Sequence, residues 1–404
     1  MKASAFVYPW DVVGDPEAAR RLADLGVEQV TLASAYHSTR ALTPRHPRHR
    51  IVTAAHAAVL HPVDEDRWKG RRLRPYPAGD WAPGDAYGRA AEELAAAGLD
   101  VHSWVVLAHN SRLGEEFPDT SVVNAYGDRY PWAPCIAQDG TREYLTGLAA
   151  ESAVRDGAGG TELESLGWYG LAHLHAHDKT AGVPLGDAAQ YLMSLCFCPA
   201  CRDGYAGQGL DARTLAGEVR AALEPVWRGA AAGDGGWPGV EELLGAATAA
   251  ATRAWRDTTA RGLQETVVAA VRAAAPDGFR VLLHADPRSW HCGANAGVDP
   301  EHVLGVADGV VVPCTAGPAL LPAFAAHARP GTVLAANLTV VTGMGGDPRS
   351  LAANAGQAAA LGATELRLYH AGLASDADLE AVAAGVRAVR AARSPEEGAR
   401  GRTT

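Results

Sequence analysis

Eight short apolar runs alternate with helical patterns along this chain of 404 residues, and the alternation constrains the fold more than any other feature. Each run is nearly continuous in apolar character, which is typical of strands covered on both faces. Strands that alternate with helices predict a single (β/α)8 barrel over residues 1–393, followed by a disordered tail at 394–404. The predicted strands are Ser4–Trp10, Gln29–Ser34, Val101–His109, Thr161–Leu166, Phe279–Ala285, Gly309–Cys314, Thr332–Leu338 and Glu365–His370.

The longest connection lies between the fourth and fifth strands, at about residues 168–277. Ala-rich helical patterns at 212–231 and 240–275 make it a helix-rich insertion. An open doubly wound sheet is the alternative fold. No G-x-G-x-x-G or G-x-x-x-x-G-K-[ST] phosphate loop follows any predicted strand, which favours the barrel.

Charge and hydropathy narrow the class of partner. The net charge is −10, and only Lys2, Lys69 and Lys179 are lysines, which disfavours nucleic acid because phosphate binding needs clustered basic residues. No apolar run is long enough to span a membrane, and the start of the chain does not read as a signal peptide. We expect a cytoplasmic protein with a small carbohydrate substrate, and leave self-association into a homo-oligomer open.

Active sites of (β/α)8 barrels lie at the carboxyl ends of the strands, so the residues at which each run stops are the informative ones. Nearly every run stops on a polar or aromatic side chain. Aromatic rings, amides and acids together suit a sugar, whose faces stack on rings and whose hydroxyls need donors and acceptors. The candidate substrate-binding residues are Trp10, Asp11, His37, His109, Asn110, Trp168, His173, His175, His177, His284, Asn337, Tyr369 and His370.

The fourth strand carries two glutamates, Glu162 and Glu164, which point the same way because they are two residues apart. Burying a glutamate in an apolar strand costs free energy unless its charge is paired or it has a functional role. Glu164 is nearer the strand end and is the first choice for a general acid. For Glu162, pairing with an arginine inside the barrel stands as an equal alternative to a catalytic role.

Three histidines alternate in His173-Leu174-His175-Ala176-His177, on the loop after the fourth strand. In an extended segment they would face one way and could bind a metal. This supports a second hypothesis, a metal-dependent isomerase, lyase or hydrolase. The H-x-H expected after the first strand of metal-dependent amidohydrolases is missing, because that position reads Pro9-Trp10-Asp11.

The segment Cys196-Phe197-Cys198-Pro199-Ala200-Cys201 is the most specific local motif. A C-x-C-x-x-C knuckle places three thiolates around one point, and a fourth ligand would complete a tetrahedral zinc site. A set of buried free thiols is the alternative reading.

The order of motifs resembles bacterial β-galactosidases of glycoside hydrolase family 42. In that family one Cys precedes a helix after strand three, the acid stands on strand four, and a C-x-C-x-x-C follows. Here Cys135 precedes Thr141-Arg142-Glu143-Tyr144, then come Glu164 and the knuckle, so the resemblance covers about residues 100–205. It implies a barrel, a structural zinc held by Cys135, Cys196, Cys198 and Cys201, and Glu164 as the acid/base acting on a glycoside.

Two positions depart from the family pattern. Family 42 has Asn before the acid, where this chain has Leu163, and a nucleophilic Glu after strand seven, where it reads Ala335-Ala336-Asn337-Leu338-Thr339. We therefore expect a glycoside-hydrolase-like barrel outside family 42. The second carboxylate of a glycosidase would be Asp286, Asp11 or Glu162, with Asp286 favoured because its strand neighbours strand four. The missing acid also motivates a third hypothesis, a carbohydrate-binding barrel without catalysis.

Overall fold

The computed structural model describes residues 1–171, 178–180, 182–230 and 235–392. Eight parallel strands form a closed barrel, because β1 pairs with both β2 and β14. The prediction of a (β/α)8 barrel is confirmed, and every predicted run overlaps one of its strands. In order around the barrel these are β1 (Lys2–Val7), β2 (Gln29–Tyr36), β6 (Asp100–Val106), β9 (Ala158–Glu164), β10 (Arg280–Asp286), β12 (Gly309–Pro313), β13 (Val333–Thr339) and β14 (Glu365–Tyr369).

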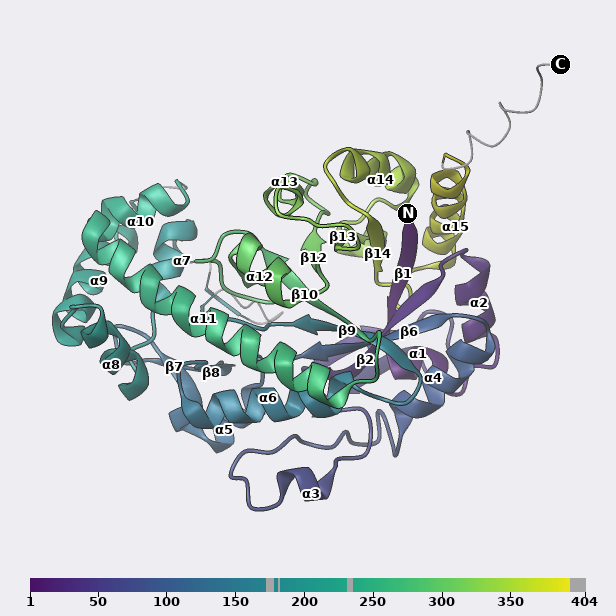
Figure 1. Ribbon diagram of the computed structural model, residues 1–404, viewed down its shortest axis with the longest axis horizontal. Helices are drawn as coiled ribbons and strands as arrows, with labels where there is room; N and C mark the ends of the chain where they lie inside the picture. Colours follow the sequence, from purple (N-terminus) through teal and green to yellow (C-terminus); the bar gives the residue numbers. More distant parts are fainter. Residues whose placement is uncertain (172–177, 181, 231–234, 393–404) are drawn as a thin grey trace.

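Helices surround the barrel (Figure 1). Their bounds are α1 (Pro9–Val12), α2 (Ala18–Asp24), α3 (Glu65–Trp68), α4 (Ala86–Ala96), α5 (Ser111–Glu116), α6 (Asp139–Ala153), α7 (Asp187–Met193), α8 (Pro199–Gly207), α9 (Ala212–Trp227), α10 (Trp237–Leu244), α11 (Ala246–Ala274), α12 (Pro300–Val306), α13 (Leu321–Ala325), α14 (Leu351–Ala360) and α15 (Asp376–Ala391). None of the helices in the described residues combines the length and apolarity that crossing a bilayer requires.

Shorter strands lie in the loops. They are β3 (Thr39–Leu42), β4 (Ile51–Ala54), β5 (Ala58–Val59), β7 (Ser121–Val123), β8 (Arg129–Pro134) and β11 (Ala296–Gly297). β3 and β4 form one antiparallel hairpin after β2, and β7 and β8 form another after β6. Both hairpins therefore belong to connections that leave the carboxyl ends of barrel strands.

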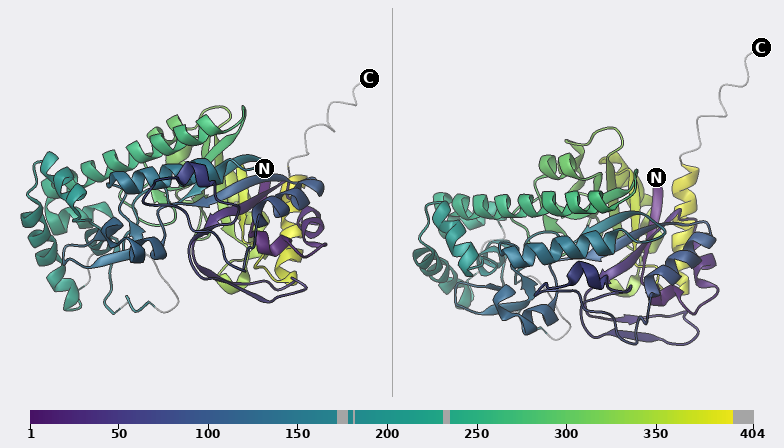
Figure 2. Two further views of the ribbon diagram at one scale, coloured as in Figure 1. Left: turned by 90° about the horizontal axis from the view of Figure 1, so that it is seen from below. Right: turned by 60° about the horizontal axis from the view of Figure 1, so that its bottom comes forward.

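Within its described residues, the connection between β9 and β10 contains five helices, α7 to α11. Figures 1 and 2 show α7, α8, α9 and α10 gathered at one end of the long helix α11, away from the N-terminus and from α15. The helical pattern predicted at 240–275 is two helices in the structure. They meet at Gly245, whose φ of +76° lies in the left-handed region that glycine tolerates best.

The barrel interior is built in layers, since alternate residues of each strand point inward. A small apolar cluster contains Leu282, Val311, Val333 and Ala335. A second layer is polar and contains the ion pair of Glu162 and Arg367. Above it Phe6 packs edge-on against Trp104, with ring centroids 4.8 Å apart, and against Tyr369 at 5.5 Å. This aromatic layer forms the floor beneath the carboxyl ends of the strands.

Candidate active site at the carboxyl ends of the strands

Glu162 lies inside the barrel with no exposed surface. Its Oε1 accepts hydrogen bonds from Arg367 Nε at 2.5 Å and from Thr31 Oγ1 at 3.1 Å, and its Oε2 is 3.5 Å from His284 Nε2. Burial alone would raise the pKa of Glu162, but the charge of Arg367 and the contact with His284 outweigh burial and lower that pKa to about 2. This position fits the alternative in which Glu162 is the counterion of a buried arginine.

Glu164 lies one layer closer to the carboxyl ends and keeps 8% of its surface exposed. Trp104, on the neighbouring strand β6, donates its indole Nε1–H to Glu164 Oε2 at 2.8 Å. Burial is the largest cause that raises the pKa of the surrounding tyrosines, and the negative charge of Glu164 adds to it. These tyrosines are Tyr8, Tyr36, Tyr169 and Tyr369. The carboxylate therefore lies among phenol groups from four different strand ends.

Ring contacts connect the predicted residues around Glu164. Tyr8 stacks on Trp10 and on His370, with centroids 4.6 and 4.3 Å apart, and donates its hydroxyl to Tyr36 Oη at 3.1 Å. Tyr36 in turn stacks on His37 at 4.2 Å. The fold thus brings together the candidates Trp10, His37, His109, Tyr369 and His370.

Several atoms of the predicted substrate-binding residues are buried without a hydrogen-bond partner in the described part of the chain. They are Trp10 Nε1, Asn337 Oδ1 and both ring nitrogens of His370. Burial lowers the pKa of His370 to about 3, so its ring is neutral at neutral pH and offers one donor and one acceptor. Buried polar groups are nearly always paired, so these atoms fit hydrogen bonds to a bound polar ligand.

Asp286 ends strand β10, next to β9, and is 2% exposed. It lies two residues after the inward-facing His284, so alternation directs it to the same side. Arg288 donates Nε–H to Oδ1 at 2.9 Å and an Nη2–H to Oδ2 at 2.7 Å. One guanidinium group thus holds both oxygens of the Asp286 carboxylate.

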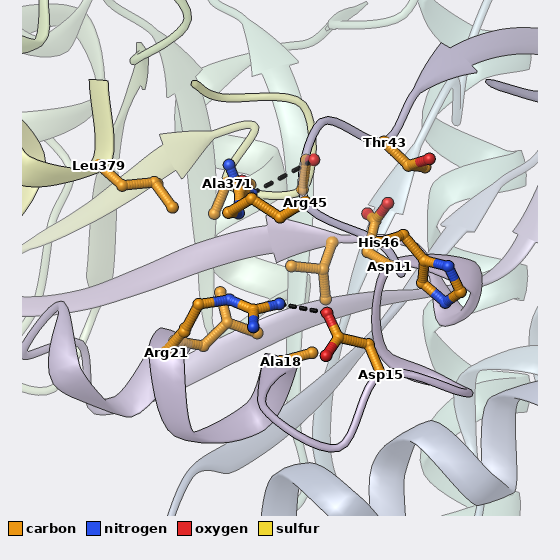
Figure 3. A pocket seen from close by; sticks show the side chains of 12 residues that line it. Asp11, Asp15, Ala18, Arg21, Thr43, Arg45, His46, Ala371 and Leu379 are labelled. Atoms are coloured by element: carbon orange, nitrogen blue, oxygen red, sulfur yellow. Dashed lines mark hydrogen bonds and ion pairs between the residues drawn. The ribbon is translucent and has the colours of Figure 1, made fainter. Parts of the chain in front are cut away.

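Asp11 lies elsewhere, in a cavity on the outer side of β1 (Figure 3). Its Oδ2 accepts the backbone N–H of Tyr8 at 2.8 Å, while Oδ1 is buried without a hydrogen-bond partner among the described residues. Burial raises the pKa of Asp11 to about 7, although the Tyr8 N–H and the charge of Arg45 oppose that rise. The cavity also contains the ion pair of Arg21 and Asp15.

Two further candidates have other partners. Asn110 accepts the backbone N–H of Leu113 and caps α5, and its amide reaches Tyr144 Oη at 3.4 Å. Trp168 points into the helical connection, where its Nε1–H donates to Arg256 O at 2.9 Å. The predicted histidines His173, His175 and His177 lie outside the described residues.

Sequence reasoning missed four residues that surround Glu164: Tyr8, Tyr36, Trp104 and Tyr169. Tyr8 and Tyr36 stand at the ends of predicted strands, beside the chosen Trp10 and His37. For Trp104 the available signal was its place in an apolar run next to the fourth strand. Its contact with Glu164 depends on the register between β6 and β9, which pairs Trp104 with Glu162 and Val106 with Glu164.

Four buried cysteines form a separate cluster in the connections after β6 and β9: Cys135, Cys196, Cys198 and Cys201. Their sulfurs lie within 4.8 Å of one another, and Cys135 Sγ is 3.6 Å from the sulfurs of both Cys198 and Cys201. Sulfurs at about 2.3 Å from a tetrahedral metal stand about 3.8 Å apart, so the cluster has the dimensions of a metal site with four thiolate ligands. Backbone N–H groups of Val123 and Cys198 point at Cys196 Sγ, as expected around a thiolate.

No protein-family model and no curated protein matches the sequence. The fold, however, is similar to solved glycosidase structures. α-L-Fucosidase isoenzyme 2 from Paenibacillus thiaminolyticus has a TM-score of 0.55 at 12% identity, over 97% of this chain and 50% of that one. β-Galactosidase from the psychrophilic Marinomonas ef1 has a TM-score of 0.53 at 10% identity, over 96% of this chain and 60% of that one. The catalytic domain of β-amylase from Paenibacillus polymyxa has a TM-score of 0.57 at 13% identity, over 97% of this chain and 98% of that one. The chain thus spans about half the length of the fucosidase. At these identities the likeness shows a shared barrel fold.

Proposed function

We propose that this chain is a glycoside hydrolase in which Glu164 is the general acid. The observation that carries the proposal is the position of Glu164, at the carboxyl end of β9, buried except for 8% of its surface, and held by Trp104 among tyrosines from four strand ends. A general acid needs this combination of a fixed orientation and access to the leaving group. The barrel fold shared with a fucosidase, a β-galactosidase and a β-amylase supports the same function.

In this mechanism the Glu164 carboxyl group gives its proton to the glycosidic oxygen as the bond to the anomeric carbon breaks. Asp286 is the second carboxylate. Oriented by its pair with Arg288, it either activates a water molecule or attacks the anomeric carbon directly. Oδ2 accepts one hydrogen bond from Arg288 and retains a free lone pair for this step.

The substrate-binding groups would be Trp10, Asn337 and His370, whose buried polar atoms have no partner among the described residues. Sugar hydroxyls both donate and accept hydrogen bonds, so one ring can satisfy an indole N–H, an amide oxygen and an imidazole together. Tyr369 and His37 line the same cluster and would contact the ring of the sugar.

A panel of p-nitrophenyl glycosides tests the proposal, and two of the similar structures suggest including the α-L-fucoside and the β-D-galactoside. We expect turnover of at least one glycoside, and a loss of more than about 100-fold in Glu164→Gln with unchanged thermal unfolding. The exposed Glu143→Gln variant is the control. Unchanged activity in Glu164→Gln would end the assignment.

A carbohydrate-binding barrel without catalysis is the second candidate. Two observations favour it: Arg288 engages both oxygens of Asp286, and β13 carries Asn337 and no carboxylate near its carboxyl end. Stabilisation of the protein by sugars without turnover of any glycoside in the panel would select this candidate.

We further propose that the four-cysteine cluster holds a structural zinc ion. Four thiolates and no open position are the donor set of structural zinc sites, and the sulfurs already stand at the required spacing. Bound there, zinc would fix Cys135, which directly precedes α6, to the α8 segment of the connection. Its role is to stabilise the fold and lies apart from the reaction at Glu164.

A further inference from the structure

A second cavity opens between α7 and the segment that follows β10. Its volume is about 120 Å³, and it is bounded by Asp187, Gln190, Tyr191, Ser194, Trp290 and His291, with Cys292 beside them. Both walls belong to connections that leave carboxyl ends of barrel strands, β9 on one side and β10 on the other. The cavity therefore lies on the same end of the barrel as Glu164 and Asp286.

Arg288 connects this cavity to Asp286. Its guanidinium forms the bidentate pair with Asp286, reaches Asp187 Oδ2 at 3.4 Å, and lies 5.4 Å from the centre of the Trp290 ring. One side chain thus contacts the proposed second carboxylate and two residues that line the cavity. A ligand that extends from Asp286 past Arg288 would enter this space.

The lining residues suit a sugar ring. Trp290 supplies an indole surface, while Gln190 has no side-chain hydrogen-bond partner among the described residues. Burial lowers the pKa of His291, so its neutral imidazole offers one donor and one acceptor at neutral pH. An aromatic surface flanked by an amide, an imidazole and a carboxylate is the combination that a hydroxylated ring requires.

Hydrogen bonds to residues of α11 hold the two walls of the cavity in place. Arg256 is 1% exposed and donates to Ser194 O at 2.9 Å and to Cys292 Sγ at 2.8 Å, so it ties the two walls together. Tyr191 hydrogen-bonds Thr252 Oγ1 at 3.0 Å. A cavity formed before binding loses less entropy when a ligand enters.

We infer that this cavity is a binding subsite for a second sugar unit of an oligosaccharide, with Trp290 and Gln190 as its specificity-determining residues. The inference rests on the proposed function. It assigns the substrate class as oligosaccharides of at least two units, whose reacting bond lies at Glu164 and Asp286 and whose neighbouring ring occupies the cavity.

Calorimetric titration of the Glu164→Gln protein tests the subsite without turnover. The probes are three series of increasing length: glucose, maltose and maltotriose; cellobiose and cellotriose; galactose, galactobiose and galactotriose. We expect one series to gain at least about tenfold in affinity from one unit to two or three. Trp290→Ala and Gln190→Ala, each added to the Glu164→Gln protein, should remove that gain. Trp227→Ala, which alters an aromatic residue on α9, is the matched control and should retain it.

The corresponding kinetic experiment uses variants that retain Glu164. Trp290→Ala should raise KM for the longer saccharide and leave kcat/KM for the matching p-nitrophenyl monosaccharide within about twofold. The subsite proposal is overturned if affinity does not rise with saccharide length in any series. It is also overturned if the rise persists in both variants. Hydrolysis of p-nitrophenyl glycosides without a length effect rejects the subsite and keeps the glycosidase. Length-dependent binding without hydrolysis rejects the glycosidase and keeps the subsite.

Discussion

Trp104 on β6 donates its indole N–H to the Oε2 atom of Glu164 on β9, at 2.8 Å, inside the ring of aromatic residues that covers the barrel interior. This hydrogen bond becomes stronger as Glu164 gives up its proton, because a hydrogen bond to a carboxylate is shorter and stronger than one between neutral groups. It fixes one oxygen of Glu164 and leaves the other for a substrate. Trp104 is therefore a positioning residue for the proposed acid.

Replacing Trp104 with Phe should lower kcat/KM by about 10- to 100-fold, because a hydrogen bond to a charged group contributes about 1.5–3 kcal/mol. The effect should appear in kcat more than in KM, since the indole acts through Glu164. Steady-state kinetics together with thermal unfolding measures it. Trp227→Phe, on α9, is the control. Equal activity in Trp104→Phe and the control would show that the contact has no role in catalysis.

Asp11 gives a prediction about stability. Its pKa in the folded protein is about 7, raised by burial above the ordinary 3.8, so folding favours the protonated form. Stability from this group is greatest below about pH 4 and is lost as the pH rises through 7. Asp11→Asn should therefore be more stable than the wild type at pH 8, by up to about 4 kcal/mol, with a difference that shrinks toward pH 4. Urea unfolding at pH 5 and pH 8 measures this, and a pH-independent difference would contradict it.

The ion pair of Glu162 and Arg367 is fully buried, so the two residues should be strongly coupled. Glu162→Gln or Arg367→Met alone should cost about 3–5 kcal/mol of unfolding free energy, because each leaves an unpaired charge or a broken network. The double variant should cost much less than the sum of the two single variants. Urea denaturation of all four proteins gives the coupling energy, and simple additivity would argue against an interacting pair.

Metal analysis tests the cysteine cluster. The purified chain should contain one zinc ion, and Cys198→Ser should lower both the zinc content and the unfolding temperature, because structural zinc stabilises the folded state. Cys314→Ser is the control, since Cys314 is a buried free thiol outside the cluster. A wild-type protein without bound metal would contradict the zinc assignment.

The strands were predictable because each barrel strand is buried on both faces, which leaves a nearly continuous apolar run in the sequence. The break between α10 and α11 at Gly245 was not predictable, because helical patterns extend on both sides of this glycine. A single glycine inside a helical pattern is usually interpreted as part of one continuous helix. Its positive φ becomes apparent only when the packing of α10 against α11 is known.

The site was predictable in part. Parallel strands bring their carboxyl ends to one place, so residues at strand ends such as Tyr369 and His370 gather there. Cross-strand contacts depend on register, which one sequence does not specify. Trp104 as the partner of Glu164 follows from the register between β6 and β9. Arg367 instead reaches Glu162 across the barrel interior, because β14 and β9 are not neighbouring strands. The outward position of Asp11 follows from the short helix α1, which begins immediately after β1.

The central claim is that Glu164 protonates the leaving group, and a leaving-group series tests it most directly. The measurement is kcat/KM of wild type and Glu164→Gln on phenyl, p-nitrophenyl and 2,4-dinitrophenyl glycosides of the sugar that is turned over. A general acid matters most when the leaving group is poor. We predict that the loss is largest for the phenyl glycoside and smallest for the dinitrophenyl glycoside. A loss of equal size across the series, or no loss, would contradict the assignment.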